Sequence, residues 1–228
     1  MNPFELQNPT KIIFGTDSYT KITTELPKGA KILMTYGGGS IFKNGVYDQV
    51  KEQLKDFDFK EFGGIEPNPS LETLTKALAV IKEENIDFLF AVGGGSVIDG
   101  TKFLAAAALY DGEPWDIPKK AIRVTEALPF ATVLTLPATG TESNSGAVIT
   151  NKATGEKLGM GSPALFPKFS CLNPEVVKSI PKRQLVNGVM DAYTHVLEQY
   201  LTYPIGAELQ DRFAESILST LINLAPKL

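Results

Sequence analysis

The stretch Ala91-Val92-Gly93-Gly94-Gly95-Ser96-Val97-Ile98-Asp99-Gly100-Thr101-Lys102 decides the fold of this chain. The continuous apolar run from Phe88 to Val92 that leads into it is typical of a strand buried on both faces of a parallel sheet. Three glycines end this strand, and a helical pattern then continues through Ala108. Glycines let a phosphate approach the backbone closely, and the first N–H groups of a helix point at it. The stretch therefore predicts an anion site, although a plain turn with a helix cap has the same pattern.

Two other expected strands end in related turns. Gly37-Gly38-Gly39-Ser40 follows the strand expected at 31–36, and a hydroxyl-rich run from Pro137 to Asn144 follows the one expected at 131–136. The glycine turn at 93–95 matches neither Gly-x-Gly-x-x-Gly nor a P-loop. Because ligands bind outside the carboxyl ends of strands in open α/β sheets, we expect all three turns to surround one cleft.

Strand and helix patterns alternate along the first 180 residues. Strands are expected at 11–15, 31–36, 60–65, 88–92, 131–136, 147–150 and 169–172, and helices at 17–26, 46–55, 71–84 and 96–108. Two long helical patterns, 182–202 and 207–225, then follow with no strand after them. This order predicts a Rossmann-like, doubly wound α/β domain over 1–180, followed by the incomplete beginning of an all-α domain at 181–228. The patterns leave the order of the strands in the sheet open.

The composition is that of a soluble globular protein, with 43% hydrophobic and 21% charged residues among 228. The net charge of −4 argues against a nucleic-acid partner and against an anionic membrane surface. The single cysteine, Cys171, excludes an internal disulfide and fits a reducing compartment. The sequence has no apolar run of membrane-spanning length, and its first residues lack the features of a signal peptide. We therefore expect a cytoplasmic protein.

The one histidine, His195, lies four residues after Asp191. On a helix this spacing puts both side chains on one face, where carboxylate and imidazole together suit Zn²⁺, Fe²⁺ or Mn²⁺. An ordinary surface pair has the same spacing. A Ser-His-Asp site is poorly supported, because the sequence has no Gly-x-Ser-x-Gly elbow. A Cys171–His195 dyad stays open, although Cys171 lies in an apolar strand pattern that is typical of a core residue.

Two lysines stand close to these motifs. Lys102 is expected to be a surface charge on its helix, with its stem covering apolar neighbours. Lys157, in the run from Thr154 to Lys157, is typical of a solvated turn lysine.

Taken together, these motifs resemble the iron-containing, metal-dependent (group III) alcohol dehydrogenases, and in particular their NADPH-dependent aldehyde reductase and butanol dehydrogenase branch. The segments that carry the resemblance are Tyr36–Ser40, Phe62–Pro69, Gly93–Phe103, Leu136–Asn144 and the helix around Asp191 and His195. They follow one another in the family's order as far as residue 200, so the likeness covers essentially the whole chain.

The resemblance implies a nicotinamide coenzyme that lies across the three turns. It implies that Gly94, Gly95 and Ser96 hold the pyrophosphate, with Gly93 also binding the cofactor, and that Asp99 lies near the nicotinamide. Gly37, Gly38, Gly39 and Ser40 would face the adenosine ribose. The ribose and nicotinamide part of the cleft would be lined by Thr135, Thr139, Thr141, Asn144 and Lys157.

The second glycine turn bears on the choice between NADP and NAD. NAD sites usually place a carboxylate against the ribose 2′-hydroxyl, and Gly37–Ser40 contains none. Ser40 can donate to a 2′-phosphate, with Lys43 close along the chain. We therefore predict NADP(H).

For the metal, the resemblance implies that Asp191 and His195 are the first two ligands. The family's other ligands are two histidines farther along in a helical domain, and this sequence contains neither. We therefore expect the N-terminal portion of such a protein, with helices 182–202 and 207–225 exposing apolar surface. The metal, Fe²⁺ or Zn²⁺, stays open. The resemblance also implies a homodimer joined partly by the strand near Lys11 to Phe14.

The implied reaction is hydride transfer between NADP(H) and a small aldehyde or primary alcohol at a divalent metal. Two alternatives stay open: a nucleotide-binding remnant without turnover, and an enzyme of the same fold that resembles glycerol dehydrogenase.

Overall fold

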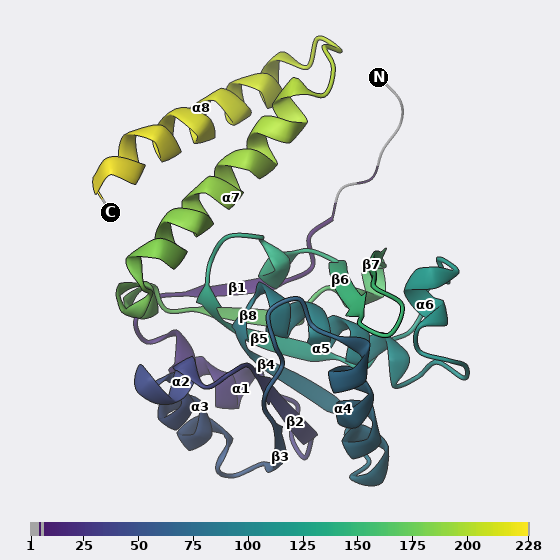
Figure 1. The fold of residues 1–228 in the computed structure, drawn as a ribbon. Coiled ribbons are helices and arrows are strands. Elements are labelled where there is room, and N and C mark those ends of the chain that lie inside the picture. The colour runs from purple at the N-terminus through teal and green to yellow at the C-terminus, as the bar shows by residue number, and fades with distance from the viewer. Residues whose placement is uncertain (1–4, 6, 228) are drawn as a thin grey trace.

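The computed structural model describes residues 5 and 7–227, and its centre is a parallel sheet (Figure 1). The six strands lie in the order β1-β8-β5-β4-β2-β3. Their bounds are β1 Lys11–Phe14, β2 Lys31–Tyr36, β3 Asp58–Phe62, β4 Phe88–Gly94, β5 Phe130–Leu136 and β8 Phe169–Leu172. Every neighbouring pair is parallel, as in the doubly wound α/β fold that the sequence predicts. A separate antiparallel hairpin pairs β6, Gly146–Asn151, with β7, Glu156–Gly161.

Helices cover both faces of the sheet. The helices are α1 Ile22–Glu25, α2 Ser40–Lys43, α3 Val46–Leu54, α4 Leu71–Glu83, α5 Gly95–Ala107, α6 Asp116–Lys119, α7 Lys182–Leu201 and α8 Glu208–Leu224. Successive side chains of a strand point to opposite faces, so Leu89 and Ala91 of β4 pack with α4 and α5, whereas Phe90 and Val92 pack with α1 to α3. The central strand β4 is therefore buried on both sides, which explains its continuous apolar run, whereas the edge strands β1 and β3 are partly exposed.

The chain reverses its direction across the sheet between β2 and β4. These two strands are neighbours, but α2 and α3 leave β2 on one face while α5 leaves β4 on the other. The carboxyl ends of β2 and β4, together with that of β5, face the same edge of the sheet. Such a switch point is where open α/β sheets hold ligands.

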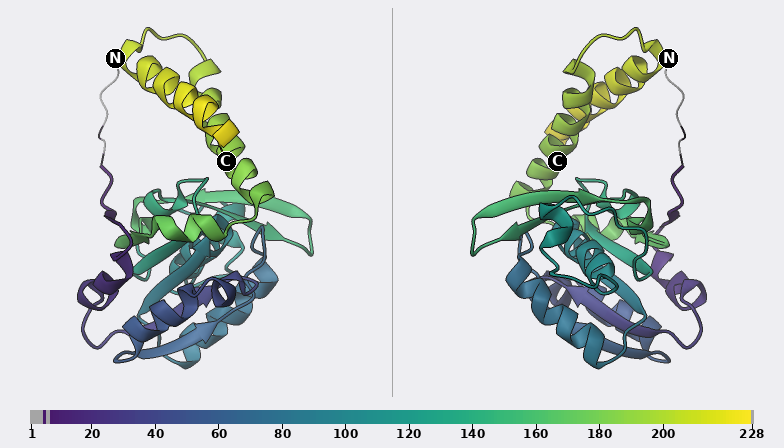
Figure 2. Two further views of the ribbon diagram at one scale, coloured as in Figure 1. Left: turned by 90° about the vertical axis from the view of Figure 1, so that its left-hand side faces the viewer. Right: turned by 90° about the vertical axis from the view of Figure 1, so that its right-hand side faces the viewer.

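Helices α7 and α8 form a hairpin that projects from the α/β part of the molecule (Figure 2). No residue of α7 is buried, and in α8 only Leu218 is. Leu209 and Phe213 of α8 are each 61% exposed and Met190 of α7 is 55% exposed, so the apolar surface expected on these helices is present. Within the part of the chain that the structure describes, no helix is both long and apolar enough to cross a membrane.

Several elements differ from the sequence prediction. The strand expected at 60–65 runs from Asp58 to Phe62, and the helix expected at 17–26 is a 3₁₀ turn followed by one α-helical turn, Ile22–Glu25. The short helices α2 and α6 and the strand β7 were not predicted. The segment expected as a strand at 147–150 lies in the β6–β7 hairpin rather than in the main sheet.

Candidate functional site

The N-terminus of α5 is open to a ligand. Gly94 precedes the helix and offers no side chain to cap it, so its first-turn N–H groups are free of a side-chain partner. The turn is crowded: a Cβ at Gly93 would lie 2.6 Å from Val97 Cγ2, and one at Gly94 would lie 3.1 Å from Leu136 Cβ. Close packing thus favours glycine at both positions, and a turn without side chains also lets an anion approach its backbone N–H groups.

Two glycine turns line one cavity of about 310 Å³. The predicted site residues among its lining are Gly37, Gly38, Ser40, Gly94, Gly95, Ser96 and Thr135. The rest of the wall is formed by Ile65, Pro67, Val97, Leu136 and Gln184. The carboxyl ends of β2, β4 and β5 thus meet at one hollow.

A second cavity, of about 570 Å³, lies beside the first. Its predicted site residues are Asp99, Thr139, Thr141, Asn144 and His195. The two hollows adjoin where Gly95, in the wall of the first, meets Thr139, in the wall of the second: a Cβ at Gly95 would lie 2.9 Å from Thr139 Oγ1. The three turns therefore line two adjoining cavities at the edge of the sheet where the sequence predicts one cleft.

Four predicted site residues do not line these cavities. Gly39 precedes α2 with a φ of 101°, a left-handed conformation that favours glycine, and Gly93 lies buried within β4. Lys157 lies on β7, and Asp191 lies on α7 one turn before His195.

Sequence reasoning assigned no role to Asn68, which links two of the site residues. Its backbone N–H donates to Ser96 Oγ at 3.2 Å, and its Oδ1 accepts from Lys157 Nζ at 2.7 Å. Its φ of 57° is left-handed, a conformation that asparagine tolerates better than most residues. Two prolines flank Asn68 in the run Glu66-Pro67-Asn68-Pro69, which is typical of a stiff turn, and this is the signal that could have indicated it.

The prediction that Lys102 lies on the surface is wrong. Lys102 is fully buried, and its Nζ donates to Thr141 Oγ1, Asn144 Oδ1 and the carbonyl of Gly146, each at 2.8 Å. Burial lowers the pKa of Lys102 to about 8, although the negative charges of Asp99 and Glu142 act to raise it. A lysine can lie inside a protein when its three donors all find acceptors, as they do here.

Asp99 lies at the inner end of the same network. Thr141 Oγ1 donates to Asp99 Oδ1 at 2.6 Å, and the backbone N–H of Val148 donates to Oδ2 at 3.0 Å. Burial raises the pKa of the Asp99 carboxyl, although these two hydrogen bonds oppose that rise. The carboxyl group is therefore held firmly at the wall of the larger cavity.

Asp191 and His195 form the predicted pair on α7. Asp191 Oδ1 lies 3.6 Å from His195 Nε2, and the side chains are 41% and 49% exposed. Oxygen and imidazole donors one helical turn apart suit Fe²⁺ or Zn²⁺, and His195 lines the cavity beside Asp99. Over residues 5 and 7–227, no cluster of three or more such ligands occurs, so the pair offers two ligands of a fuller set.

Two other groups are held by their surroundings in the fold. Cys171 is fully buried in the core, and burial raises the pKa of its thiol to about 12, so it is the predicted core residue and not a nucleophile.

At the end of β3, the carboxylate of Glu61 accepts hydrogen bonds from Tyr36 and Tyr47 and lies 3.6 Å from Lys51 Nζ. Glu61 is therefore already engaged by its neighbours.

Comparison with known proteins identifies close relatives. The chain is 51% identical to the NADPH-dependent aldehyde reductase YqhD of Escherichia coli K12 over 230 residues, and 52% identical to a probable NADH-dependent butanol dehydrogenase of Bacillus subtilis over 231 residues. Each match covers 100% of this chain, but it covers only 59% of the Escherichia coli protein and 60% of the Bacillus subtilis protein. The chain thus spans about three-fifths of the length of these relatives.

Solved structures agree with this result. The crystal structure of Escherichia coli K-12 YqhD matches 99% of this chain and 59% of its own, with a TM-score of 0.96 and 50% identity. NADH-dependent butanol dehydrogenase A of Thermotoga maritima matches 100% of this chain and 58% of its own, with a TM-score of 0.96 and 44% identity. The sequence model of one family, iron-containing alcohol dehydrogenase, matches residues 9–174. The chain therefore belongs to the iron-containing alcohol dehydrogenase family.

Proposed function

We propose that this chain binds a nicotinamide coenzyme and supplies two metal ligands to an enzyme that transfers hydride between that coenzyme and a small aldehyde or primary alcohol. One observation carries the proposal. The uncapped N-terminus of α5 opens into a cavity that adjoins a second one lined by Asp99 and His195. An anion site thus lies next to a site with a carboxylate and an imidazole.

Each part of the cleft suits one part of the coenzyme. The N–H groups at Gly95 and Ser96 would bind the pyrophosphate. The nicotinamide would extend into the larger cavity, toward Asp99 and Asn144. Asp191 and His195 would hold a divalent metal, Fe²⁺ or Zn²⁺, which when bound polarises a carbonyl oxygen as a Lewis acid. The coenzyme supplies the hydride, so no protein nucleophile is required.

The finer proposal is a preference for NADP(H) over NAD(H). The relatives' names include both NADPH-dependent and NADH-dependent enzymes, so they leave the preference open. The argument is local: Gly37–Ser40 holds no carboxylate, Ser40 can donate to a 2′-phosphate, and Glu61 is engaged by its neighbours. Measured dissociation constants test it: we expect NADPH to bind at least tenfold more tightly than NADH, whereas equal or tighter NADH binding contradicts it.

A homodimer is part of the proposal as well. Among the residues that the structure describes, strand β1 pairs with β8 alone and forms one edge of the sheet, and Phe14 on it is 70% exposed. An exposed apolar edge strand is a surface that pairs readily with a second copy. Sedimentation of the chain and of a Phe14→Lys variant tests this proposal, since the variant is expected to shift the population toward monomer.

Turnover tests the enzymatic part. We expect butanal-dependent oxidation of NADPH that a chelator abolishes and that an Asp191→Ala substitution also abolishes. Oxidation that is unaffected by both treatments would contradict a metal held by Asp191.

A second function, coenzyme binding without turnover, is favoured by one observation. Asp191 and His195 stand without a third ligand among the residues described, and two ligands hold a metal weakly. Tight NADPH binding to a folded chain that shows no butanal-dependent oxidation would support this second function. A third possibility, an enzyme that resembles glycerol dehydrogenase, would show as oxidation of glycerol in place of butanol.

A further inference from the structure

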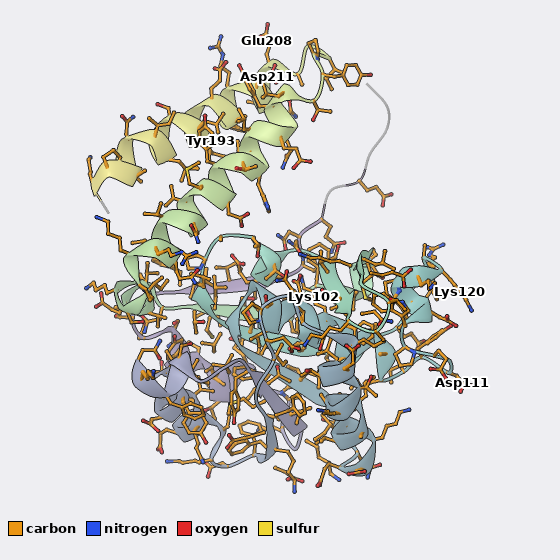
Figure 3. All side chains as sticks on the ribbon, in the orientation of Figure 1. Lys102, Asp111, Lys120, Tyr193, Glu208 and Asp211 are labelled. Atoms are coloured by element: carbon orange, nitrogen blue, oxygen red, sulfur yellow. The ribbon has the colours of Figure 1, made fainter. Side chains whose placement is uncertain are left out.

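Lys102 is buried beside the larger cavity and yet cannot touch a ligand there. Its ammonium group has three N–H donors and no acceptor, and Thr141, Asn144 and Gly146 accept all three at 2.8 Å. Figure 3 shows Lys102 within the α/β part, whereas Tyr193, Glu208 and Asp211 lie on the helical hairpin. Whatever Lys102 does for a bound coenzyme must therefore act through the groups it holds.

The first of these groups is the hydroxyl of Thr141. Because an ammonium can only donate, Thr141 Oγ1 must accept from Lys102, and the single hydroxyl proton is then directed to Asp99 Oδ1 at 2.6 Å. The other oxygen of Asp99 accepts from the N–H of Val148 at 3.0 Å. Lys102 and the carboxylate, which can only accept, thus together fix the direction of the hydrogen bond that orients Asp99.

The second group is the amide of Asn144. Its Oδ1 accepts from Lys102 Nζ at 2.8 Å and from the backbone N–H of Gly146 at 3.0 Å, which uses both lone pairs. A side-chain amide can flip by half a turn, but a flipped Asn144 would turn its own N–H groups toward the ammonium. The buried charge therefore leaves the NH₂ group of Asn144, a donor, to meet a ligand in the cavity that Asn144 lines.

The chemistry of the nicotinamide matches this pattern. Its carboxamide oxygen is an acceptor and would be recognised by a fixed NH₂ donor. A flipped asparagine would instead present an oxygen to that oxygen, and the two acceptors would repel each other.

We propose that Lys102 is a positioning residue for coenzyme recognition: its ammonium locks Asn144 as a hydrogen-bond donor toward the nicotinamide carboxamide and holds Asp99 through Thr141. The inference rests on the proposed function, because it requires that a nicotinamide coenzyme occupies this cleft. Without the ammonium, only the backbone N–H of Gly146 still holds Asn144 Oδ1, so the amide flips more easily and the cleft loses much of its selectivity for an acceptor at that place.

The test compares NADPH with its thionicotinamide analogue, in which sulfur, a much weaker acceptor, replaces the carboxamide oxygen. Dissociation constants are measured for the unsubstituted chain, for Lys102→Met, and for Lys82→Met, the same change at an exposed lysine of α4. We expect the unsubstituted chain and Lys82→Met to prefer NADPH at least tenfold. In Lys102→Met we expect weaker NADPH binding and a preference that falls to within twofold.

A second variant keeps the test decisive if Lys102→Met does not fold. Asn144→Asp retains oxygens for Lys102 and Gly146 but removes the NH₂ donor, and we expect the same loss of preference. A loss of NADPH affinity with the preference intact, in either variant, means that Lys102 has only a structural role and overturns the proposal. An unsubstituted chain that binds no NADPH refutes the proposed function itself, and this inference falls with it.

Discussion

The hydroxyl of Thr139 lies where a side chain on Gly95 would have to be, because a Cβ there would be 2.9 Å from Thr139 Oγ1. Gly95 begins α5, and Thr139 belongs to the loop after β5. These two residues lie 44 positions apart in the sequence, and their contact brings the two turns together at the junction of the two cavities. Glycine is thus needed at position 95 by the loop that it meets as much as by a phosphate.

This contact predicts the outcome of a double-mutant cycle. Gly95→Ala should destabilise the chain by about 1–3 kcal/mol, the usual cost of inserting a methyl group into a packed site. Thr139→Ala removes both the Oγ1 and the Cγ2 that the new methyl would meet, so it should restore part of that loss in the double variant. Urea unfolding of the four proteins measures the coupling. Strictly additive effects would mean that Thr139 is not what Gly95 makes room for.

A second prediction concerns acid stability at Glu66. Burial alone would raise the pKa of Glu66, but hydrogen bonds from Lys152, Ser70 and Thr73 outweigh it and lower the pKa to about 2 from an ordinary 4.5. Since the folded pKa lies below the unfolded one, the stabilisation is complete above about pH 4.5 and is lost as the pH falls through 4.5 toward 2.

Glu66→Gln tests this prediction, and Glu84→Gln is its matched control. Glu84 pairs with Lys60 at 3.2 Å on the surface, where both side chains are more than 40% exposed. We expect the stability advantage of the unsubstituted chain over Glu66→Gln to shrink as the pH falls from 5 to 2, as measured by denaturant unfolding at each pH. An advantage that stays constant over that interval contradicts the lowered pKa.

A third prediction concerns metal binding at Asp191 and His195. His195 is the one histidine of the sequence and is 49% exposed, so replacing it should leave the fold intact. We expect the chain to bind Co²⁺ weakly, and His195→Ala or Asp191→Asn to weaken that binding at least tenfold. Visible absorption during a Co²⁺ titration measures the affinity. Asp211→Asn, on the neighbouring helix α8, is the control and should bind as the unsubstituted chain does.

Much of the fold follows from local sequence. Strands β2 and β8 have the bounds that their apolar runs predict, and α4 and α5 end within one residue of the prediction. These elements are buried on at least one face, so their apolar patterns are strong. Strand β7 was missed because Glu156–Gly161 carries two charges and two glycines, and only its pairing with β6 makes it a strand.

The site was predictable where it depends on backbone turns and not where it depends on contacts between distant segments. Lys102 meets acceptors that lie 39, 42 and 44 positions later, so nothing near it in the sequence indicates burial. The strand order could not be predicted for the same reason, since β1 pairs with β8 and Lys11 lies opposite Phe169. Asn68 likewise joins Lys157, which lies 89 positions away.

The most direct test of the central claim uses Ser96, whose Oγ accepts from the N–H of Asn68 at the start of α5. Ser96→Asp and Ser96→Asn both keep an acceptor for that N–H, but only the aspartate adds a negative charge where the pyrophosphate would bind. We expect NADPH to bind the unsubstituted chain saturably, Ser96→Asn within about threefold of it, and Ser96→Asp at least tenfold more weakly. A folded chain that binds no NADPH, or a Ser96→Asp variant that binds it as tightly as Ser96→Asn, would contradict a coenzyme held at this turn.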